Sequence, residues 1–232
     1  MNPSAGFIPD PPAGPPQDPP QEPPGAAADI AAALTEQGWC VTDGFVSPLL
    51  VSQLRHEAQA RWQKGEFRRA GVGRGADLEV RPEVRTDRVL WLDPAALTGA
   101  QRCYWDALEA VRLAVNQAMY LGLHELEAHF AVYPPGSYYR RHLDQFRGIG
   151  RRRLSCILYL NDDWQAADGG ALRIYTEPVD ADRGEAGVAS GDCVEVLPLG
   201  GRFVTFLSAR FLHEVLPARR ERFSLTGWLL SR

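Results

Sequence analysis

Long hydrophobic runs, paired cysteines and lysine are almost absent from this sequence of 232 residues. No run of ~18 apolar residues occurs, so no segment is expected to span a membrane. The N-terminus lacks a basic region followed by an apolar run, which argues against a secretory signal. The formal net charge of -4 gives no general attraction to nucleic acid or anionic lipid. We therefore expect a cytoplasmic protein with neither nucleic acid nor membrane among its partners.

The four cysteines, Cys40, Cys103, Cys156 and Cys193, are widely spaced and form no CxxC pair. This spacing favours free thiols in a cytosolic chain over a disulfide framework or a zinc knuckle. Lysine occurs only at Lys64, and arginine supplies the other basic residues. Because arginine codons are rich in G and C, we expect a GC-rich bacterial genome as the source.

Proline is concentrated at the N-terminus, where residues 1–24 hold ten of the 18 prolines. Such a segment has too few apolar residues to form a core and favours extended polyproline II conformations. The sequence predicts a disordered leader over residues 1–28. The alternative is a docking site for a partner protein that recognises proline-rich segments.

Three later segments have apolar residues at helical spacing, namely 28–38, 47–65 and 99–122. The second begins with Ser47 and Pro48, a favoured pair for an N-cap and a first helical turn. Residues 65–93 are rich in glycine and charge, which suggests a mobile loop leading into a strand around Val89–Leu92.

Short runs of β-branched and aromatic residues dominate the chain after about residue 124, separated by Gly, Pro and Asn-Asp. Many short strands at this spacing are typical of a sandwich or barrel. The sequence predicts a mainly β fold with supporting helices, in a single domain over residues 29–232. Residues 29–123 would form the helical support and residues 124–232 the β core.

Two motifs in the β half carry residues suited to a metal. His142 and Asp144 are two apart, and such positions of a strand point to the same face. Alone, this pair is more typical of an ordinary polar strand edge, but His213 follows on a later strand. Two histidines and one carboxylate form a facial triad that holds Fe(II) and leaves three positions open. No cysteine falls in either motif, so the ligand set does not favour zinc or an iron–sulfur cluster.

Arg222 stands in an apolar strand segment, where an unpaired guanidinium would be costly to bury. Arginine pairs well with carboxylates, so the position suggests an anionic ligand such as a 2-oxo acid bound near the metal. The alternative is an ion pair with an internal aspartate or glutamate.

A specific order of motifs connects these residues. HLD (142–144) is followed by CILYLNDDW (156–164), GGALRIY (169–175), PLGGRFVTFLS (198–208) and HEVLPARRERFSLTGW (213–228). Over residues 85–230 this order resembles the Fe(II)/2-oxoglutarate-dependent oxygenases. It is most similar to the prolyl hydroxylases of the hypoxia-sensing type and their bacterial relatives. The collagen type usually has lysine where this chain has Arg222. The resemblance implies a double-stranded β-helix core, the jelly-roll or cupin-like architecture.

Matched position by position, the resemblance implies roles for five residues. His142, Asp144 and His213 would hold the iron. Arg222 would bind the distal carboxylate of 2-oxoglutarate, and Tyr159 would donate a hydrogen bond to the same carboxylate. For Tyr159, an ordinary place in the barrel core remains an equal alternative.

The resemblance also implies a lining for the 2-oxoglutarate pocket. Tyr133 matches a tyrosine of that pocket, and Leu172 and Val215 would be its apolar walls. Strand alternation places Thr226 on the same side as Arg222, so Thr226 is expected to line the pocket too.

On the substrate side, Trp228 matches a tryptophan near the bound prolyl residue, with barrel core as the alternative. The loop ending at residue 93 resembles a finger loop that folds over a peptide. Asp87 and Arg152 match an acidic–basic pair that links this loop to the rim of the site, and a solvated carboxylate is the alternative for Asp87. The turn before His142 is about one residue shorter than in the family, and the segment after Asp144 differs.

The activity implied is hydroxylation of a prolyl residue in a protein or peptide, with O2 consumed and succinate and CO2 formed. Ascorbate would be a possible reductant. Two alternatives remain: the same chemistry on a free amino acid or small metabolite, and a non-catalytic module that binds iron or oxygen. The long finger loop favours a peptide, and the intact set of His142, Asp144, His213 and Arg222 favours catalysis.

Overall fold

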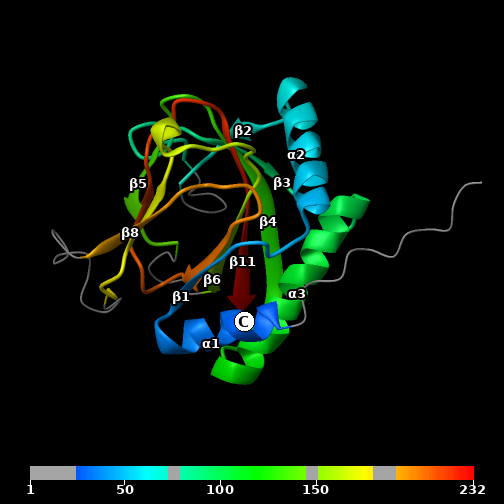
Figure 1. The fold of residues 1–232 in the computed structure, drawn as a ribbon, viewed down its shortest axis with the longest axis vertical. Coiled ribbons are helices and arrows are strands. Elements are labelled where there is room, and N and C mark those ends of the chain that lie inside the picture. The colour runs from blue at the N-terminus through cyan, green and yellow to red at the C-terminus, as the bar shows by residue number, and fades with distance from the viewer. Residues whose placement is uncertain (1–24, 73–78, 145–150, 180–191) are drawn as a thin grey trace, which may run out of the picture.

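The computed structural model describes residues 25–72, 79–144, 151–179 and 192–232 (Figure 1). The expected leader therefore falls almost wholly on residues 1–24, outside the described part. Its predicted end at residue 28 is too late, because the first helix, α1, spans Ala26–Glu36. Parts of the expected finger loop (73–78) and of the segment after Asp144 (145–150) also lie outside the described residues.

The three predicted helices are confirmed, as α1, α2 (Pro48–Gln63) and α3 (Gly99–Met119). The Ser47 hydroxyl accepts a hydrogen bond from the backbone N–H of Leu50 at 3.2 Å, as the Ser-Pro start predicts. Helix α3 begins with a capping box between Thr98 and Gln101. Among the described residues, no helix is long and apolar enough to cross a membrane.

Two antiparallel sheets make up the β part. The large sheet has the order β1 (Trp39–Thr42), β9 (Phe203–Leu207), β6 (Arg152–Tyr159), β11 (Arg222–Ser231), β4 (Leu123–Tyr133), β3 (Arg88–Trp91) and β2 (Arg68–Arg69). The small sheet has the order β5 (Tyr139–His142), β10 (His213–Val215), β7 (Leu172–Tyr175) and β8 (Cys193–Val196).

Two clusters of buried side chains hold the layers together. One lies where the helices cover the large sheet, and it joins Leu34, Leu54 and Leu108 to Phe130 and Leu225. Figure 1 shows α2 and α3 along this sheet and α1 across its end near the C-terminus. The other cluster lies between the two sheets and contains Ile157, Tyr159, Leu172, Ile174 and Phe206.

Two packed sheets in this strand order form a double-stranded β-helix, so the predicted fold class is confirmed. The expected boundary near residue 124 is too sharp, however. Strands β1, β2 and β3 come from the first 123 residues and pair at the two ends of the large sheet. Of these, only β3 corresponds to a strand expected from the sequence, the one around Val89–Leu92.

The register of β11 brings separate motifs side by side. On one side Arg222 pairs with Tyr133 and Thr226 with His129 of β4. On the other side Trp228 pairs with Ser155 of β6. Alternate residues of a strand share a face, so the even-numbered positions from 222 to 228 line the space between the sheets.

Candidate active site

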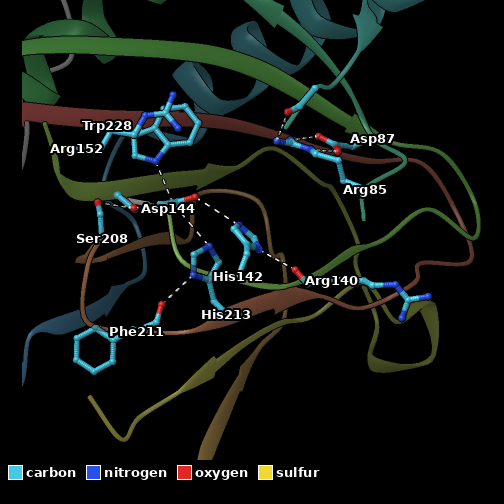
Figure 2. Close-up of polar contacts among 12 residues, drawn as sticks. Arg85, Asp87, Arg140, His142, Asp144, Arg152, Ser208, Phe211, His213 and Trp228 are labelled. Carbon is cyan, nitrogen blue, oxygen red and sulfur yellow. Dashed lines mark hydrogen bonds and ion pairs between the residues drawn. The ribbon is translucent and has the colours of Figure 1, made fainter. Parts of the chain in front are cut away.

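His142, Asp144 and His213 converge on one point between the sheets (Figure 2). Their ligand atoms all lie within 4.8 Å of one another. The Nε2 atom of His142 is 3.4 Å from Oδ1 of Asp144, and Nε2 of His213 is 3.7 Å from Oδ2. His142 and His213 are direct partners across β5 and β10, which accounts for the approach of the two imidazoles. Strand alternation is the wrong reason for the place of Asp144, because β5 ends at His142 and Asp144 lies in the following bend.

Both imidazoles are oriented through their other ring nitrogen. Nδ1 of His142 is 2.7 Å from the carbonyl oxygen of Arg140, and Nδ1 of His213 is 3.1 Å from that of Phe211. A carbonyl can only accept, so each Nδ1 carries a proton and each Nε2 faces the centre of the cluster. Burial, with His213 nearby, lowers the pKa of His142 to about 4, so its imidazole is neutral at pH 7 and can bind a metal.

The Asp144 carboxylate is held by two donors. Its Oδ2 accepts hydrogen bonds from the Ser155 hydroxyl at 2.7 Å and from the Trp228 indole N–H at 2.9 Å. Ser155 in turn lies 2.9 Å from the Ser208 hydroxyl. Burial alone would raise the pKa of Asp144, but the imidazoles of His213 and His142 outweigh it and hold this pKa well below its usual value. The site therefore presents a charged carboxylate with a fixed orientation.

Arg222 lies deeper between the sheets and is 2 % exposed. Its Nε donates to the Gly170 carbonyl at 2.8 Å, and its guanidinium lies between the rings of Tyr133 and Tyr159, 4.9 Å and 4.8 Å from their centroids. Within the described chain no carboxylate pairs with Arg222, so the alternative of an internal ion pair fails there. The hydroxyl of Tyr159 is also buried without a hydrogen-bond partner.

A cavity connects Arg222 with the three clustered side chains. The expected pocket residues Tyr133, Leu172, Val215 and Thr226 all line it. Tyr159 is not among the residues that line this cavity, but its ring lies against the guanidinium of Arg222, which does line it. The structure thus brings the three expected iron ligands, Arg222 and these four pocket residues to one cavity, while their roles stay predictions.

The expected pair between Asp87 and Arg152 is wrong. Asp87 is 1 % exposed and receives two hydrogen bonds from Arg85, at 2.7 Å and 2.6 Å, so it is also not a solvated carboxylate. Arg152 instead bonds Glu127 at 2.7 Å and stacks 3.6 Å from the ring centroid of Trp228. Asp87 pairs with Arg85, which is two residues away in the chain. Arg152 pairs with Glu127, which lies opposite Trp228 on the neighbouring strand β4.

Two residues that the sequence reasoning missed support His142. The ring of Tyr139 stacks on the imidazole with 3.5 Å between centroids, and the Arg85 guanidinium lies 4.1 Å from the centroid of Tyr139. The Asp87–Arg85 pair therefore reaches the metal-ligand cluster through Tyr139. Tyr139 lies three residues before His142, but its contact with Arg85 is seen only in the fold, where the two residues form an isolated antiparallel bridge.

A wider groove of about 570 Å³ opens beside the cluster, between β2, β3 and the end of β6. Its wall is aromatic: the ring of His129 lies 4.8 Å from Trp91 and 5.3 Å from Trp228. Asp144 and Trp228 line both the groove and the deeper cavity. A long segment lying in the groove would therefore pass the metal-ligand cluster.

Comparison with known proteins agrees with this geometry. Residues 128–230 match the family model described as the 2OG-Fe(II) oxygenase superfamily. A prolyl-4-hydroxylase structure from Pseudomonas putida is 40% identical and superposes with a TM-score of 0.75, over 89% of this chain and 99% of that one. Mouse prolyl hydroxylase EGLN3 is 30% identical over 86% of this chain and 81% of its own length. The chain belongs to the 2OG-Fe(II) oxygenase superfamily.

Human Egl nine homolog 1 is 31% identical over 86% of this chain, but the match covers only 45% of the human protein. The chain spans about half the length of the Egl nine homologs it matches, from 45% to 57%. The 2OG-Fe(II) oxygenase match covers His142, Asp144 and His213 as well as Arg222 and Trp228.

The residues present fit both groups that the superfamily name implies. Two imidazole nitrogens and one charged carboxylate form the facial donor set of Fe(II). A buried guanidinium without a carboxylate, beside an unpartnered tyrosine hydroxyl, fits the far carboxylate of 2-oxoglutarate. The cavity between them joins the two halves of the site.

Removing the Ser155 hydroxyl should weaken metal binding by this 2OG-Fe(II) oxygenase. Ser155→Ala deletes one of the two donors that orient Asp144. Loss of such an outer hydrogen bond typically lowers metal affinity by ~10–100-fold. Titration with Mn(II), followed by the rise in melting temperature, measures this affinity. Ser231→Ala, at the half-buried C-terminal end of β11, serves as the control, and equal affinities in the two variants would contradict the role given to Ser155.

Gly170 should be intolerant of any side chain. Its φ of 69° is in the left-handed region, and an added Cβ would lie 2.9 Å from the Ala218 Cβ and 3.2 Å from the Arg222 Cδ. Gly170→Ala should displace the guanidinium and weaken 2-oxoglutarate binding by roughly tenfold, since about one hydrogen bond to a charged group is lost. Gly44→Ala, with a similar φ of 69° and open space around it, controls for backbone strain. Calorimetric titration of 2-oxoglutarate in the presence of Mn(II) separates the two variants.

Proposed function

We propose that this chain hydroxylates a prolyl residue of a protein or peptide, using Fe(II), 2-oxoglutarate and O2 and releasing succinate and CO2. One observation carries the proposal: the metal-ligand cluster lies where a small cavity lined by Arg222 meets a wider groove with an aromatic wall. The cavity suits 2-oxoglutarate, and the groove suits an extended chain. The similarity to prolyl hydroxylases supports the choice of proline.

The same chemistry on a free amino acid or small metabolite is the second candidate. A small substrate would need only a closed pocket over the metal. The groove instead continues past the metal-ligand cluster to the exposed residues of β2 and β3. We therefore favour a peptide over a small molecule.

The bound iron and 2-oxoglutarate supply the oxidising chemistry, and the protein supplies geometry and a dry cavity. Arg222 and Tyr159 bind the far carboxylate of 2-oxoglutarate, and Leu172 and Val215 keep water from its apolar stem. His142, Asp144 and His213 leave one face of the metal open. Trp228 holds Asp144 through its N–H while its ring contacts the bound prolyl residue.

The test is succinate formation. The protein is mixed anaerobically with Fe(II) and 2-oxoglutarate, oxygen is added, and succinate is measured with and without a panel of proline-containing peptides. Succinate that rises with one peptide, together with one added oxygen atom on a proline of that peptide, supports the proposal. Slow succinate formation that no peptide stimulates would favour the small-molecule candidate. No succinate with the metal bound would favour a non-catalytic binding module.

Three further points belong to the proposal. The four cysteines carry free thiols, which supports a cytoplasmic location. Ascorbate would serve as a reductant that keeps the iron ferrous. A protein or peptide containing proline is the expected partner.

A further inference from the structure

The groove beside the metal-ligand cluster has a positive charge that no ion pair balances. Arg68 and Arg69 of β2 line it, are exposed, and pair with no carboxylate that the structure describes. Apart from Asp144 of the metal-ligand cluster, the other charged side chains of the groove wall have ion-pair partners. Those pairs are Arg85–Asp87, Arg152–Glu127 and Arg61–Glu66. The groove therefore attracts a segment that carries negative charge.

The groove also offers an aromatic surface suited to proline. Trp91 is 50% exposed although it lies beside Trp228, with 6.1 Å between the ring centroids. Proline-rich segments dock in aromatic-lined grooves because their backbone is already stiff and their rings pack on aromatic faces. A segment rich in both proline and acidic residues matches the groove on both counts.

Such a segment stands at the N-terminus of this same chain. Residues 1–24 hold ten prolines, and the dipeptide Pro-Pro recurs at 11–12, 15–16, 19–20 and 23–24, every four residues. The acidic side chains are Asp10, Asp18 and Glu22, and the segment has neither lysine nor arginine. This segment has no part in the function proposed above.

We propose that the chain hydroxylates prolines of its own residues 1–24, which dock in the groove lined by Arg68, Arg69 and Trp91. This inference rests on the proposed prolyl hydroxylase function. One atom of O2 enters a C–H bond of the proline as a hydroxyl group. The other atom ends in succinate, as 2-oxoglutarate is oxidised and loses CO2. The C–H bond and 2-oxoglutarate each give two electrons, which together reduce O2 fully.

The length of residues 1–24 determines which of their prolines can reach the metal-ligand cluster of the same molecule. Figure 1 shows α1, which follows Gly25, at the end of the molecule opposite β2. A chain of 232 residues has a radius of gyration of ~17 Å, and an extended chain spans at most ~3.5 Å per residue. Pro12 can therefore lie up to ~45 Å from Gly25. Pro23 and Pro24 stay next to α1, so the reaction should favour Pro3, Pro9, Pro11 and Pro12.

The test uses full-length chains in two isotopic forms. Active chain labelled with ¹⁵N is mixed with an equal amount of unlabelled Asp144→Ala chain, and Fe(II), 2-oxoglutarate and oxygen are added. Mass spectrometry then follows oxygen addition to residues 1–24 of each form. We expect the labelled chain to be modified first at the four distal prolines, at a rate that does not change on tenfold dilution. The unlabelled chain should stay almost unmodified.

A charge reversal tests the groove. Arg68→Glu with Arg69→Glu should slow modification of residues 1–24 by about tenfold, because two attractive interactions become repulsive. Arg102→Glu with Arg232→Glu makes the same change in net charge at exposed positions outside the groove, and should alter the rate less than twofold. Equal rates in the two double variants would overturn the assignment of the groove.

A panel of proline-containing peptides from other proteins is assayed in parallel. It distinguishes failure of this inference from failure of the proposed prolyl hydroxylase function. Hydroxylated peptides with an unmodified N-terminal segment would overturn the inference and leave the proposed function intact. Equal modification of labelled and unlabelled chains would also overturn it, since the segment would then react from solution. Absence of hydroxylation on the segment and on every peptide would remove the proposed function itself.

Discussion

Asp144→Ala should abolish both metal binding and succinate formation. Asp144 is the only carboxylate of the metal-ligand cluster, and its Oδ1 and Oδ2 lie 3.4 Å and 3.7 Å from the two imidazoles. Without it, only the two imidazoles remain as ligands, and an imidazole ligand does not compensate the charge of a divalent ion. A ligand at 100 times its dissociation constant stabilises the native state by ~2.7 kcal/mol, and this gain should disappear. The melting temperature with and without Mn(II) measures it.

The control is Asp106→Ala, an exposed carboxylate on α3. It should keep the full Mn(II)-dependent rise in melting temperature. The unliganded Asp144→Ala chain must also show a cooperative melting transition, which excludes loss of the fold as the cause. Turnover that survives in a folded Asp144→Ala chain would contradict the assignment of the iron site.

Arg222→Met should eliminate 2-oxoglutarate binding without destabilising the unliganded protein. Hydrogen bonds to charged groups contribute ~1.5–3 kcal/mol each, so losing a bidentate pair weakens binding by at least about 100-fold. In the unliganded protein the guanidinium is 2 % exposed and bonds only to the Gly170 carbonyl among the described residues. Replacing a buried charge without a counter-charge by an apolar side chain of similar length is neutral or stabilising. The free energy of unfolding should therefore stay equal or rise.

Two measurements separate these effects. Titration of 2-oxoglutarate with Mn(II) present measures affinity, and urea denaturation without ligand measures stability. Arg202→Met removes a guanidinium that pairs with Asp43 at the surface, and serves as the matched control. It should keep 2-oxoglutarate affinity and lose a little stability. A large loss of stability in unliganded Arg222→Met would show that Arg222 is a structural residue rather than a ligand-binding one.

Local patterns predicted most of the fold. The Ser47-Pro48 start of α2 and the periodicity of α3 depend on residues within a few positions of each other, so they can be recognised in a sequence. The same is true of the strands after residue 124. The addition of β1 and β2 to the ends of the large sheet could not be predicted, because it depends on pairing with strands far along the chain.

The site divides in the same way. His142, Asp144, His213 and Arg222 lie in recognisable motifs, and the structure brings all four to one cavity. The partners of Asp87 and Arg152 could not be read from their types, because an acidic and a basic residue are compatible with many pairings. Only the packing shows that each has a nearer partner, Arg85 or Glu127.

Strand β11 has a consequence for how this protein could change its substrate. Arg222 lies at the 2-oxoglutarate end of the strand and Trp228 at the groove end, about 20 Å apart at ~3.3 Å per residue. Substitutions near Trp228 can thus alter which substrate is accepted while the cofactor end stays intact. Insertion of one residue between them would turn every later side chain to the opposite face. Point substitutions near Trp228 can therefore change the substrate, whereas insertions or deletions within β11 would disrupt both ends of the site.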